Sequence, residues 1–200
     1  IQNIAAVCQS IVVMTNNAAR ILMEDYDIFH RKINVIPYGT HLVSHLSESF
    51  LKEKYGFKDR KVLTTFGLLG SEKSIETTLE ALPAVVKNTP EALFLIIGKN
   101  HPEVAKQEGE TYRNMLEEMA RKLGVQDHVR FINSDLSLPE LLEYLQLTDV
   151  YLFTSNDSNQ AVSGTFAYAM ECACPIISTP IPHGRKVLTE NAGIIFDFQN

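Results

Sequence analysis

A short run of small residues, Ser163-Gly164-Thr165, stands where the chain passes from a polar loop into a helical pattern. A serine in this position can cap a helix, and Gly164 leaves backbone N–H groups accessible because it carries no Cβ. The helix dipole favours an anion at the same end. The run therefore indicates a phosphate site or, in the simpler alternative, only a helix N-cap.

Two other loops carry residues suited to an anionic ligand. Gly67 opens the run GLLGSEKS, which contains Lys73 and Ser74. A lysine in the first turn of a helix opposes the helix dipole, so a bound anion would explain Lys73 as well as a solvated surface position would. Gly98 ends another apolar run, and the Lys-Asn-His that follows it either lines a cleft or forms an ordinary turn.

Residues of a third group suit the neutral parts of a ligand. The polar loop from Asn133 through Ser134 to Leu136 follows an apolar run and could offer main-chain groups to the edge of a base. Gln160 and Tyr168 lie on either side of the Ser-Gly-Thr run. Both side chains can donate hydrogen bonds to hydroxyl groups, but neither is a strong base.

Metal and nucleophilic chemistry are not indicated. His41 and His45 have no glutamate between them in a zinc-protease pattern, and His183 is typical of a surface loop. Cys172 and Cys174 have no companion ligands, so we expect buried free thiols. The sequence has no Ser-His-Asp order, no GxGxxG after a strand and no Walker loop, which argues against hydrolases, dehydrogenases and kinases.

The elements that must position these residues alternate regularly from Lys61 onward. Apolar runs predict strands over 61–67, 92–98, 129–133, 150–153, 175–178 and 193–198. Helical periodicity predicts helices over 71–87, 110–123, 139–147 and 163–170. The alternation predicts an α/β fold with a doubly wound, Rossmann-like parallel sheet. Such sheets bind ligands at the carboxyl ends of their strands, where the candidate residues fall.

The first 60 residues are less regular. The pattern predicts strands over 11–15 and 33–37, a helix over 18–26 capped by Asn16 or Asn17, and a helix over 48–55. The chain begins without methionine and stops just after the apolar run GIIFDF. We therefore expect it to be a piece of a longer protein.

Composition narrows the classes of function. The 200 residues are 45% hydrophobic, enough for a proper core, and the net charge of −6 argues against a nucleic-acid partner. No apolar run reaches the roughly 20 residues that cross a bilayer, and no signal peptide is evident. Together with the unpaired cysteines, this predicts a cytoplasmic protein without a transmembrane segment.

The order of segments resembles the C-terminal domain of group 1 glycosyltransferases, the retaining family 4 enzymes of the GT-B architecture. The segments that carry the resemblance are KVLTTFGLLGSEKSIETTLEALPAV, ALFLIIGKNHPEV, VRFINSDLSLPELLEYLQLTDVYLFTS and SGTFAYAMECACPIISTPIPHGRKVL. The resemblance covers nearly all of residues 30–200, and INVIPYGT is similar to the family's interdomain step. It implies that residues 1–40 are the tail of an N-terminal domain and a hinge. Residues 41–200 would form the nucleotide-sugar-binding C-terminal half, truncated at its end.

The resemblance implies retaining transfer of a hexosyl group, with mannosyl as one option. The donor would be a nucleoside diphosphate sugar, and the acceptor a saccharide or lipid-linked molecule held by the missing N-terminal domain. No metal and no cofactor other than the donor is implied, and the piece alone would be inactive. Lys73 and Gln160 are the expected catalytic residues. The expected donor-binding residues are Gly67, Ser74, Gly98, Asn133, Ser134, Leu136, Ser163, Gly164, Thr165 and Tyr168.

Within that set, the resemblance assigns Lys73 and Ser163–Thr165 to the donor diphosphate and 133–136 to the base. The chain also departs from the family's pattern. Gln160 and Tyr168 stand where two glutamates normally contact the transferred sugar and the ribose, and Leu68 stands where an arginine is usual.

Ser74 is a further departure, because a glycine is usual at its position. A bacterial subgroup of the family resembles this chain in reading QAVSGT or QITSGT. Two alternatives follow from the departures and the shared architecture. One is a non-catalytic relative that binds a sugar or a partner protein, and the other is a sugar-nucleotide epimerase.

Overall fold

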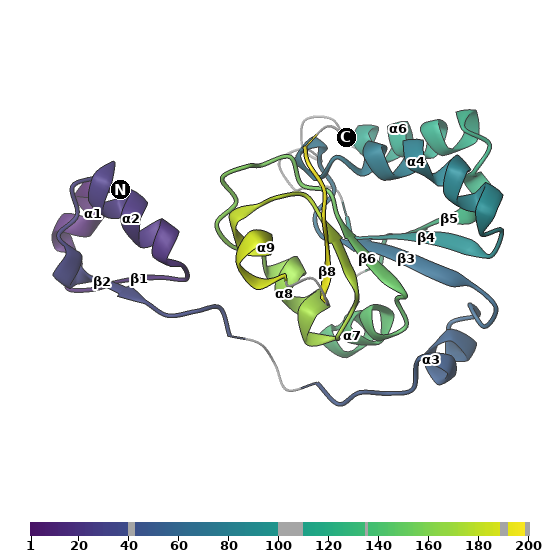
Figure 1. The fold of residues 1–200 in the computed structure, drawn as a ribbon, viewed down its shortest axis with the longest axis horizontal. Coiled ribbons are helices and arrows are strands. Elements are labelled where there is room, and N and C mark those ends of the chain that lie inside the picture. The colour runs from purple at the N-terminus through teal and green to yellow at the C-terminus, as the bar shows by residue number, and fades with distance from the viewer. Residues whose placement is uncertain (40–42, 100–109, 135, 189–191, 199–200) are drawn as a thin grey trace.

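The structure is a computed structural model that describes residues 1–39, 43–99, 110–134, 136–188 and 192–198 (Figure 1). Its main sheet has six parallel strands in the order β5-β4-β3-β6-β7-β8. The strands are β3 (Lys61–Phe66), β4 (Ala92–Ile97), β5 (Val129–Ile132), β6 (Val150–Phe153), β7 (Ile176–Ser178) and β8 (Gly193–Ile195). The chain builds outward from β3 in one direction and from β6 in the other. This order confirms the predicted doubly wound sheet and puts its switch point between β3 and β6.

Helices cover both faces of this sheet (Figure 1). They are α3 (Glu48–Lys54), α4 (Ile75–Asn88), α6 (Thr111–Lys122), α7 (Leu138–Gln146), α8 (Gly164–Glu171) and α9 (Pro182–Val187). Every residue of β4 is buried, and its side chains alternate between the two cores. Leu95 faces the core shared with α7 and α8, whereas Phe94 and Ile96 face the core shared with α4 and α6. A continuous apolar run is what a central parallel strand needs to fill both layers.

A small second unit precedes this sheet. It contains α1 (Gln2–Val7), β1 (Ile11–Val13), α2 (Asn16–Glu24), the 3-10 helix η1 (His30–Lys32) and β2 (Ile33–Val35). Strands β1 and β2 pair in parallel as a two-stranded sheet. The cap of α2 is Thr15, whose Oγ1 accepts a hydrogen bond from the Ala18 N–H at 3.1 Å. The prediction of an asparagine cap was therefore wrong.

The helix predicted over 71–87 is also interrupted. Residues Ser71–Lys73 form a 3-10 turn (η2), and the α-helix begins only at Ile75. Between them, Ser74 has left-handed backbone angles, with φ of 45°. Helical periodicity is insensitive to one left-handed residue, because the apolar positions of α4 keep their spacing from Ile75 onward. A second 3-10 turn, η3 (Gln126–His128), precedes β5.

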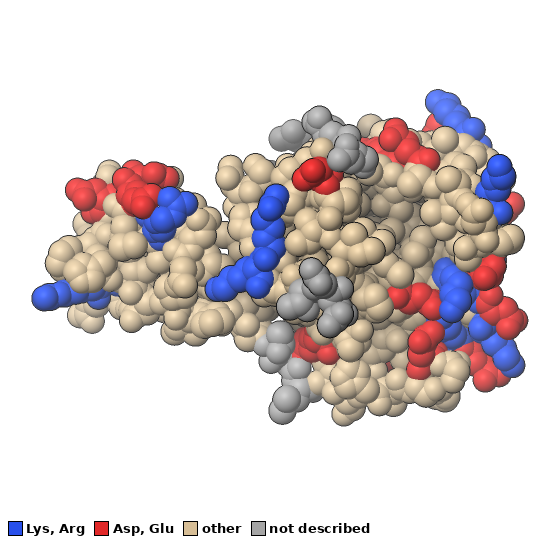
Figure 2. Space-filling model, in the orientation of Figure 1, with Lys and Arg blue, Asp and Glu red and all other residues tan. Residues whose placement is uncertain are grey.

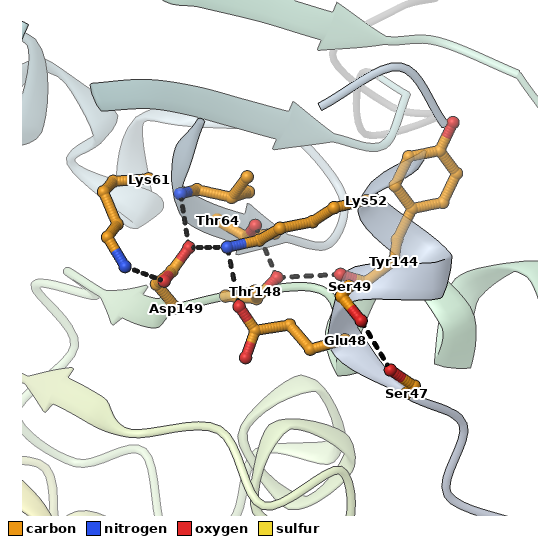
Figure 3. Close-up of polar contacts among 10 residues, drawn as sticks. Ser47, Glu48, Ser49, Lys52, Lys61, Thr64, Tyr144, Thr148 and Asp149 are labelled. Carbon is orange, nitrogen blue, oxygen red and sulfur yellow. Dashed lines mark hydrogen bonds and ion pairs between the residues drawn. The ribbon is translucent and has the colours of Figure 1, made fainter. Parts of the chain in front are cut away.

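A buried ion pair fixes α3 to the amino end of the sheet. The Lys52 ammonium lies 2.5 Å from Asp149 Oδ2 and 2.7 Å from Glu48 Oε1 (Figure 3). Lys52 is only 5% exposed, so its charge needs both partners. Asp149 also accepts a hydrogen bond from the Val62 N–H at 2.7 Å, which joins the starts of β3 and β6. Burial raises the pKa of Asp149, but hydrogen bonds from Lys52 and Val62 outweigh it, and the net pKa lies below its ordinary value.

Asp149→Asn is expected to lower the free energy of unfolding by about 3 kcal/mol at pH 7, because it leaves the buried Lys52 ammonium without its closest carboxylate. Since the native pKa of Asp149 is lowered, its contribution is complete above about pH 4 and is lost as the pH falls through the native pKa. Urea unfolding at several pH values measures this, with Lys61→Ala as control. Lys61 contacts the same carboxylate at 3.2 Å but is exposed, so its removal should cost less than about 1 kcal/mol. Equal losses for the two variants would contradict the role of the buried pair.

Candidate functional site

A pocket of about 360 Å³ opens at the carboxyl ends of β3, β4 and β5. It gathers five of the residues predicted from the sequence, although those residues come from four separate loops or helix starts. They are Gly67, Gly98, Ser134, Leu136 and Thr165. The rest of the lining is Phe66, Leu68, Ile97, Lys99 and Leu141. Apolar side chains thus form much of the wall, and glycines and polar groups form its rim near the switch point.

The two glycines of the pocket touch one another through their backbones. Gly98 has a φ of +140°, and a Cβ added to it would stand 1.8 Å from the Gly67 carbonyl oxygen. Gly67 itself has a φ of +145°. Only glycine tolerates both the backbone angles and the approach. The glycines therefore shape the lining of the pocket by letting two loops lie closer than any side chain would permit.

Lys73 extends its side chain toward the same glycine. Its Cε would lie 3.6 Å from a Cβ on Gly67, and Thr165 Cγ2 would lie 3.4 Å from that point. The ammonium is 5.8 Å from the centre of the Phe153 ring, within range of a cation–π contact. No carboxylate of the described residues lies within ion-pair distance of it. The sequence thus provides a half-buried positive charge at the switch point that no described acidic group neutralises.

The turn that carries Lys73 is held by the loop after β6. Thr154 Oγ1 donates a hydrogen bond to the Lys73 carbonyl at 2.6 Å. The Asn156 N–H donates to the Glu72 carbonyl at 3.0 Å. The left-handed Ser74 follows directly and turns the chain into α4. These contacts link the two loops at the switch point, so the position of the ammonium depends on both.

The start of α8 has backbone donors to spare. Ser163 caps the helix by accepting a hydrogen bond from the Phe166 N–H at 3.3 Å, and its own N–H donates to His183 Nδ1 at 3.2 Å. The N–H groups of Gly164 and Thr165 have no acceptor among the described residues. Gly164 also leaves room for the Tyr38 hydroxyl, because a Cβ added to this glycine would lie 3.2 Å from the hydroxyl oxygen. Two unpaired N–H groups at a helix start suit a bound anion.

Other predicted residues lie outside the pocket's lining. Gln160 is half-buried in the loop before α8, where its N–H donates to the Asp157 carbonyl. Tyr168 lies one turn into α8, with its ring edge-on to Phe66 at 6.5 Å between centres. Asn133 follows β5 directly. The roles assigned to them from the resemblance stay predictions.

Two residues that shape the candidate site, Thr154 and His183, could not be identified from their residue types. Thr154 was only part of a polar loop, and no sequence signal shows that it holds a carbonyl far away in the chain. The prediction of a surface-loop histidine at His183 is wrong, because His183 lies half-buried on α9 against the Ser163 N–H. Of the Lys-Asn-His run after Gly98, which either lines a cleft or forms an ordinary turn, Lys99 lines the pocket. Residues 100 and 101 lie outside the described residues, as does His41.

A larger pocket, of about 680 Å³, lies beside α3 at the opposite end of the sheet, where strands β3 and β4 begin. Its lining contains Lys52, Lys58, Arg60 and Lys61 together with Glu48, Asp59 and Glu91. Figure 2 shows the two signs of charge intermixed at the end of the molecule where α3 lies, with no broad area of one sign. Because these charges largely neutralise each other, this pocket offers an anion less than Lys73 and α8 do.

Three further findings concern the cysteines, metal binding and the length of the helices. Cys172 and Cys174 are free and buried, as predicted, and burial raises the pKa of each thiol to about 12. Among the residues described, no three acidic, histidine or cysteine side chains are grouped to hold a metal ion. None of the described helices combines the length and the apolar character needed to cross a membrane.

Comparison with known sequences gives a consistent picture. The sequence model of the family described as glycosyl transferases group 1 matches residues 47–200. Mannosylfructose-phosphate synthase of Agrobacterium fabrum is 25% identical over 196 residues, covering 90% of this chain and 41% of the relative. A GDP-mannose-dependent alpha-(1-6)-phosphatidylinositol monomannoside mannosyltransferase of Mycolicibacterium smegmatis is 26% identical over 133 residues, covering 64% of this chain and 32% of the relative. The chain thus spans less than half the length of either relative.

Solved structures share the fold over the whole chain. The Anabaena protein HepE, in complex with UDP, has a TM-score of 0.79 at 15% identity, and this chain covers 55% of it. Sucrose-phosphate synthase of Thermosynechococcus elongatus has a TM-score of 0.79 at 19% identity, and this chain covers 48% of it. At such identities the likeness establishes the architecture alone.

Gly98→Ala is expected to lower the free energy of unfolding by about 3 kcal/mol or more, because the new Cβ would meet the Gly67 carbonyl in a backbone conformation that alanine avoids. The matched control is Gly124→Ala, which also has a positive φ (+68°) but nothing within 4 Å of the added atom. It should cost only the backbone strain, about 1–2 kcal/mol. Urea unfolding compares the two, and similar losses would show that the glycine contact does not constrain the fold.

Proposed function

Because the chain belongs to the group 1 glycosyl transferases, we propose that its carboxyl-end pocket holds a nucleoside diphosphate sugar. The whole protein would transfer the hexosyl group, with retention of configuration, to a saccharide or lipid-linked acceptor. The single observation that carries this proposal is the meeting of Lys73, Gly67 and Thr165 at the switch point. A positive side chain and two unpaired backbone N–H groups there suit a diphosphate.

In this proposal the diphosphate lies between the Lys73 ammonium and the N–H groups of Gly164 and Thr165. As the glycosidic bond breaks, negative charge grows on the leaving nucleoside diphosphate. The ammonium and the two N–H groups are already positioned, so they stabilise that charge without reorganising, which lowers the barrier to transfer. Lys73 is therefore the proposed catalytic residue. Ser163 and Ser74 shape the turns that position the N–H groups and the Lys73 ammonium. The proposal requires no metal and no cofactor other than the donor.

The base would occupy the apolar part of the pocket. Gly98, Ser134 and Leu136 line this part of the pocket, and Asn133 lies just before Ser134 in the chain. Apolar walls suit the flat faces of a base, and main-chain groups of the 133–136 loop suit its polar edge. One of the relatives is a GDP-mannose-dependent mannosyltransferase, and solved structures of similar fold hold UDP or UDP-glucose. We therefore propose a hexose donor carried by GDP or UDP, with mannose as one option.

Gln160 and Tyr168 are proposed to contact the transferred sugar and the ribose, in place of two glutamates. An amide and a phenol can both hydrogen-bond a hydroxyl, although each offers less than a carboxylate. Relative to the family's pattern, the site has lost two negative charges here and one positive charge at Leu68. If the usual arginine contacts the diphosphate directly, its absence at Leu68 would weaken donor binding by about 1.5–3 kcal/mol.

The acceptor would bind between this domain and an N-terminal domain to which residues 1–40 contribute. Two features support this. The unit has a parallel sheet of only two strands, and such pairs are marginal unless further strands or helices complete them. Its large apolar side chains are also widely exposed, among them Ile4, Val7 and Phe29. Residues 41–200 would then form the donor-binding domain.

A second candidate is a non-catalytic relative that binds a nucleotide sugar or a partner without turnover. The observation that favours it is the replacement of both expected carboxylates, at Gln160 and Tyr168. It shares the donor pocket with the first proposal and differs only in the chemistry that follows binding. Transfer of labelled hexose by the whole protein, tested against saccharide and lipid acceptors, separates the two.

Lys73→Ala is expected to weaken nucleoside diphosphate binding about 10- to 150-fold, since a charge-assisted contact contributes about 1.5–3 kcal/mol. The melting temperature should hardly change, because no ion pair is lost. Calorimetry with UDP, GDP, ADP and their hexose conjugates measures both the affinity and the preferred base. Lys87→Ala serves as control, being an exposed lysine in the last turn of α4. A binding constant unaffected by Lys73→Ala would refute the proposed diphosphate contact, and a large loss of stability would make Lys73 structural.

A further inference from the structure

His183 sits against the start of α8 in a geometry that fixes its protonation. The Ser163 N–H donates to His183 Nδ1 at 3.2 Å, so that nitrogen must accept and cannot carry a proton. The ring packs against Phe166 with 5.1 Å between ring centres and is half-buried. A neutral imidazole with its proton on Nε2 satisfies this arrangement, whereas the imidazolium would set two N–H donors against each other.

The hydrogen bond decides which backbone donors remain for a ligand. At the start of α8 the Ser163 N–H goes to His183, and the Phe166 N–H goes to Ser163 Oγ. Only the N–H groups of Gly164 and Thr165 then lack an acceptor among the described residues. Ser163 Oγ also lies 3.0 Å from Thr165 Oγ1, so the residue that His183 holds touches the threonine that lines the donor pocket.

We propose that His183 is a positioning residue for the donor phosphates: its unprotonated Nδ1 holds the Ser163 N–H and thereby aims the Gly164 and Thr165 N–H groups at the ligand. This inference rests on the proposed function, because it needs a phosphate at α8. It adds to that function a residue that does not touch the nucleotide sugar, and it makes binding of the phosphates depend on pH. His183 acts from α9, which contacts the start of α8 through this hydrogen bond and through the packing of the ring on Phe166.

The surroundings of the ring favour the neutral form. Burial lowers the pKa of His183, and the nearby Lys186 ammonium lowers it further. The pocket that His183 shares with the segment after β2 has Tyr38 and Lys186 as its titratable lining besides His183, and no described carboxylate lines it. A lowered native pKa means that the contact is complete above the ordinary histidine pKa, near 6.5, and is lost as the pH falls through the native value.

The test compares two substitutions at this position. His183→Asn puts an amide oxygen where Nδ1 lies and cannot titrate, whereas His183→Leu fills similar space without an acceptor. Binding of UDP and of GDP is measured by calorimetry from pH 7.5 to pH 5. At pH 7.5 we expect His183→Asn to match the wild type and His183→Leu to bind about three- to tenfold more weakly, the effect of losing one hydrogen bond. His30→Asn, an exposed histidine, is the control.

As the pH falls through the lowered native pKa of His183, the wild type should lose affinity relative to His183→Asn. The phosphate of the nucleotide titrates in this range too, but equally for both proteins, so their ratio isolates His183. An unchanged ratio at every pH, or equal affinity of His183→Leu and wild type, would overturn the role of His183 and leave the proposed function standing. Failure of the wild type to bind either nucleotide would overturn both. Nitrogen NMR of the ring gives an independent test, since a proton found on Nδ1 at pH 7.5 would also overturn the proposal.

Discussion

The close approach of the backbones that leave β3 and β4 is the constraint on which the site depends. The N–H groups of Gly67 and Gly98 continue the hydrogen bonds of the sheet one residue past the strands, to the carbonyls of Ile97 and Ile132 at 3.0 Å. Both glycines have positive φ, and no side chain fits between them. The two loops therefore leave the sheet side by side. Lys73 and Thr165 then reach the same glycine from opposite sides of the switch point.

The two ends of the sheet use charge in opposite ways. At the amino end, the Lys52 ammonium contacts two carboxylates, and one of them, that of Asp149, also accepts a hydrogen bond from the Val62 N–H of β3 (Figure 3). The charges there hold structural elements together. At the carboxyl end, the Lys73 ammonium has no described carboxylate, and two N–H groups of α8 lack acceptors. Unpaired donors lower stability, and they persist where a ligand completes them. This contrast, more than pocket volume, is the reason why we propose the carboxyl end as the binding site.

Much of the fold follows from patterns of residues in the sequence. The six apolar residues of β4 are a strand buried on both faces, and the Ser163 cap of α8 follows from the residue type and its place before a helical pattern. What could not be predicted depends on contacts between distant segments. Ser74 is left-handed in a turn that Thr154 holds through a hydrogen bond to a residue 81 positions away, and the role of His183 depends on its distance to a backbone N–H. Neither contact leaves a mark on local periodicity or composition.

Chemical-shift mapping of the isotope-labelled protein with UDP and with GDP would test the central claim most directly, because it reports where a nucleotide sits without assuming turnover. The account predicts that the largest amide shifts fall at the carboxyl ends of the strands, on Gly67, Gly98, Ser134, Gly164 and Thr165. Shifts concentrated instead around α3 and the larger amino-end pocket, from Ser47 to Lys61, would contradict it.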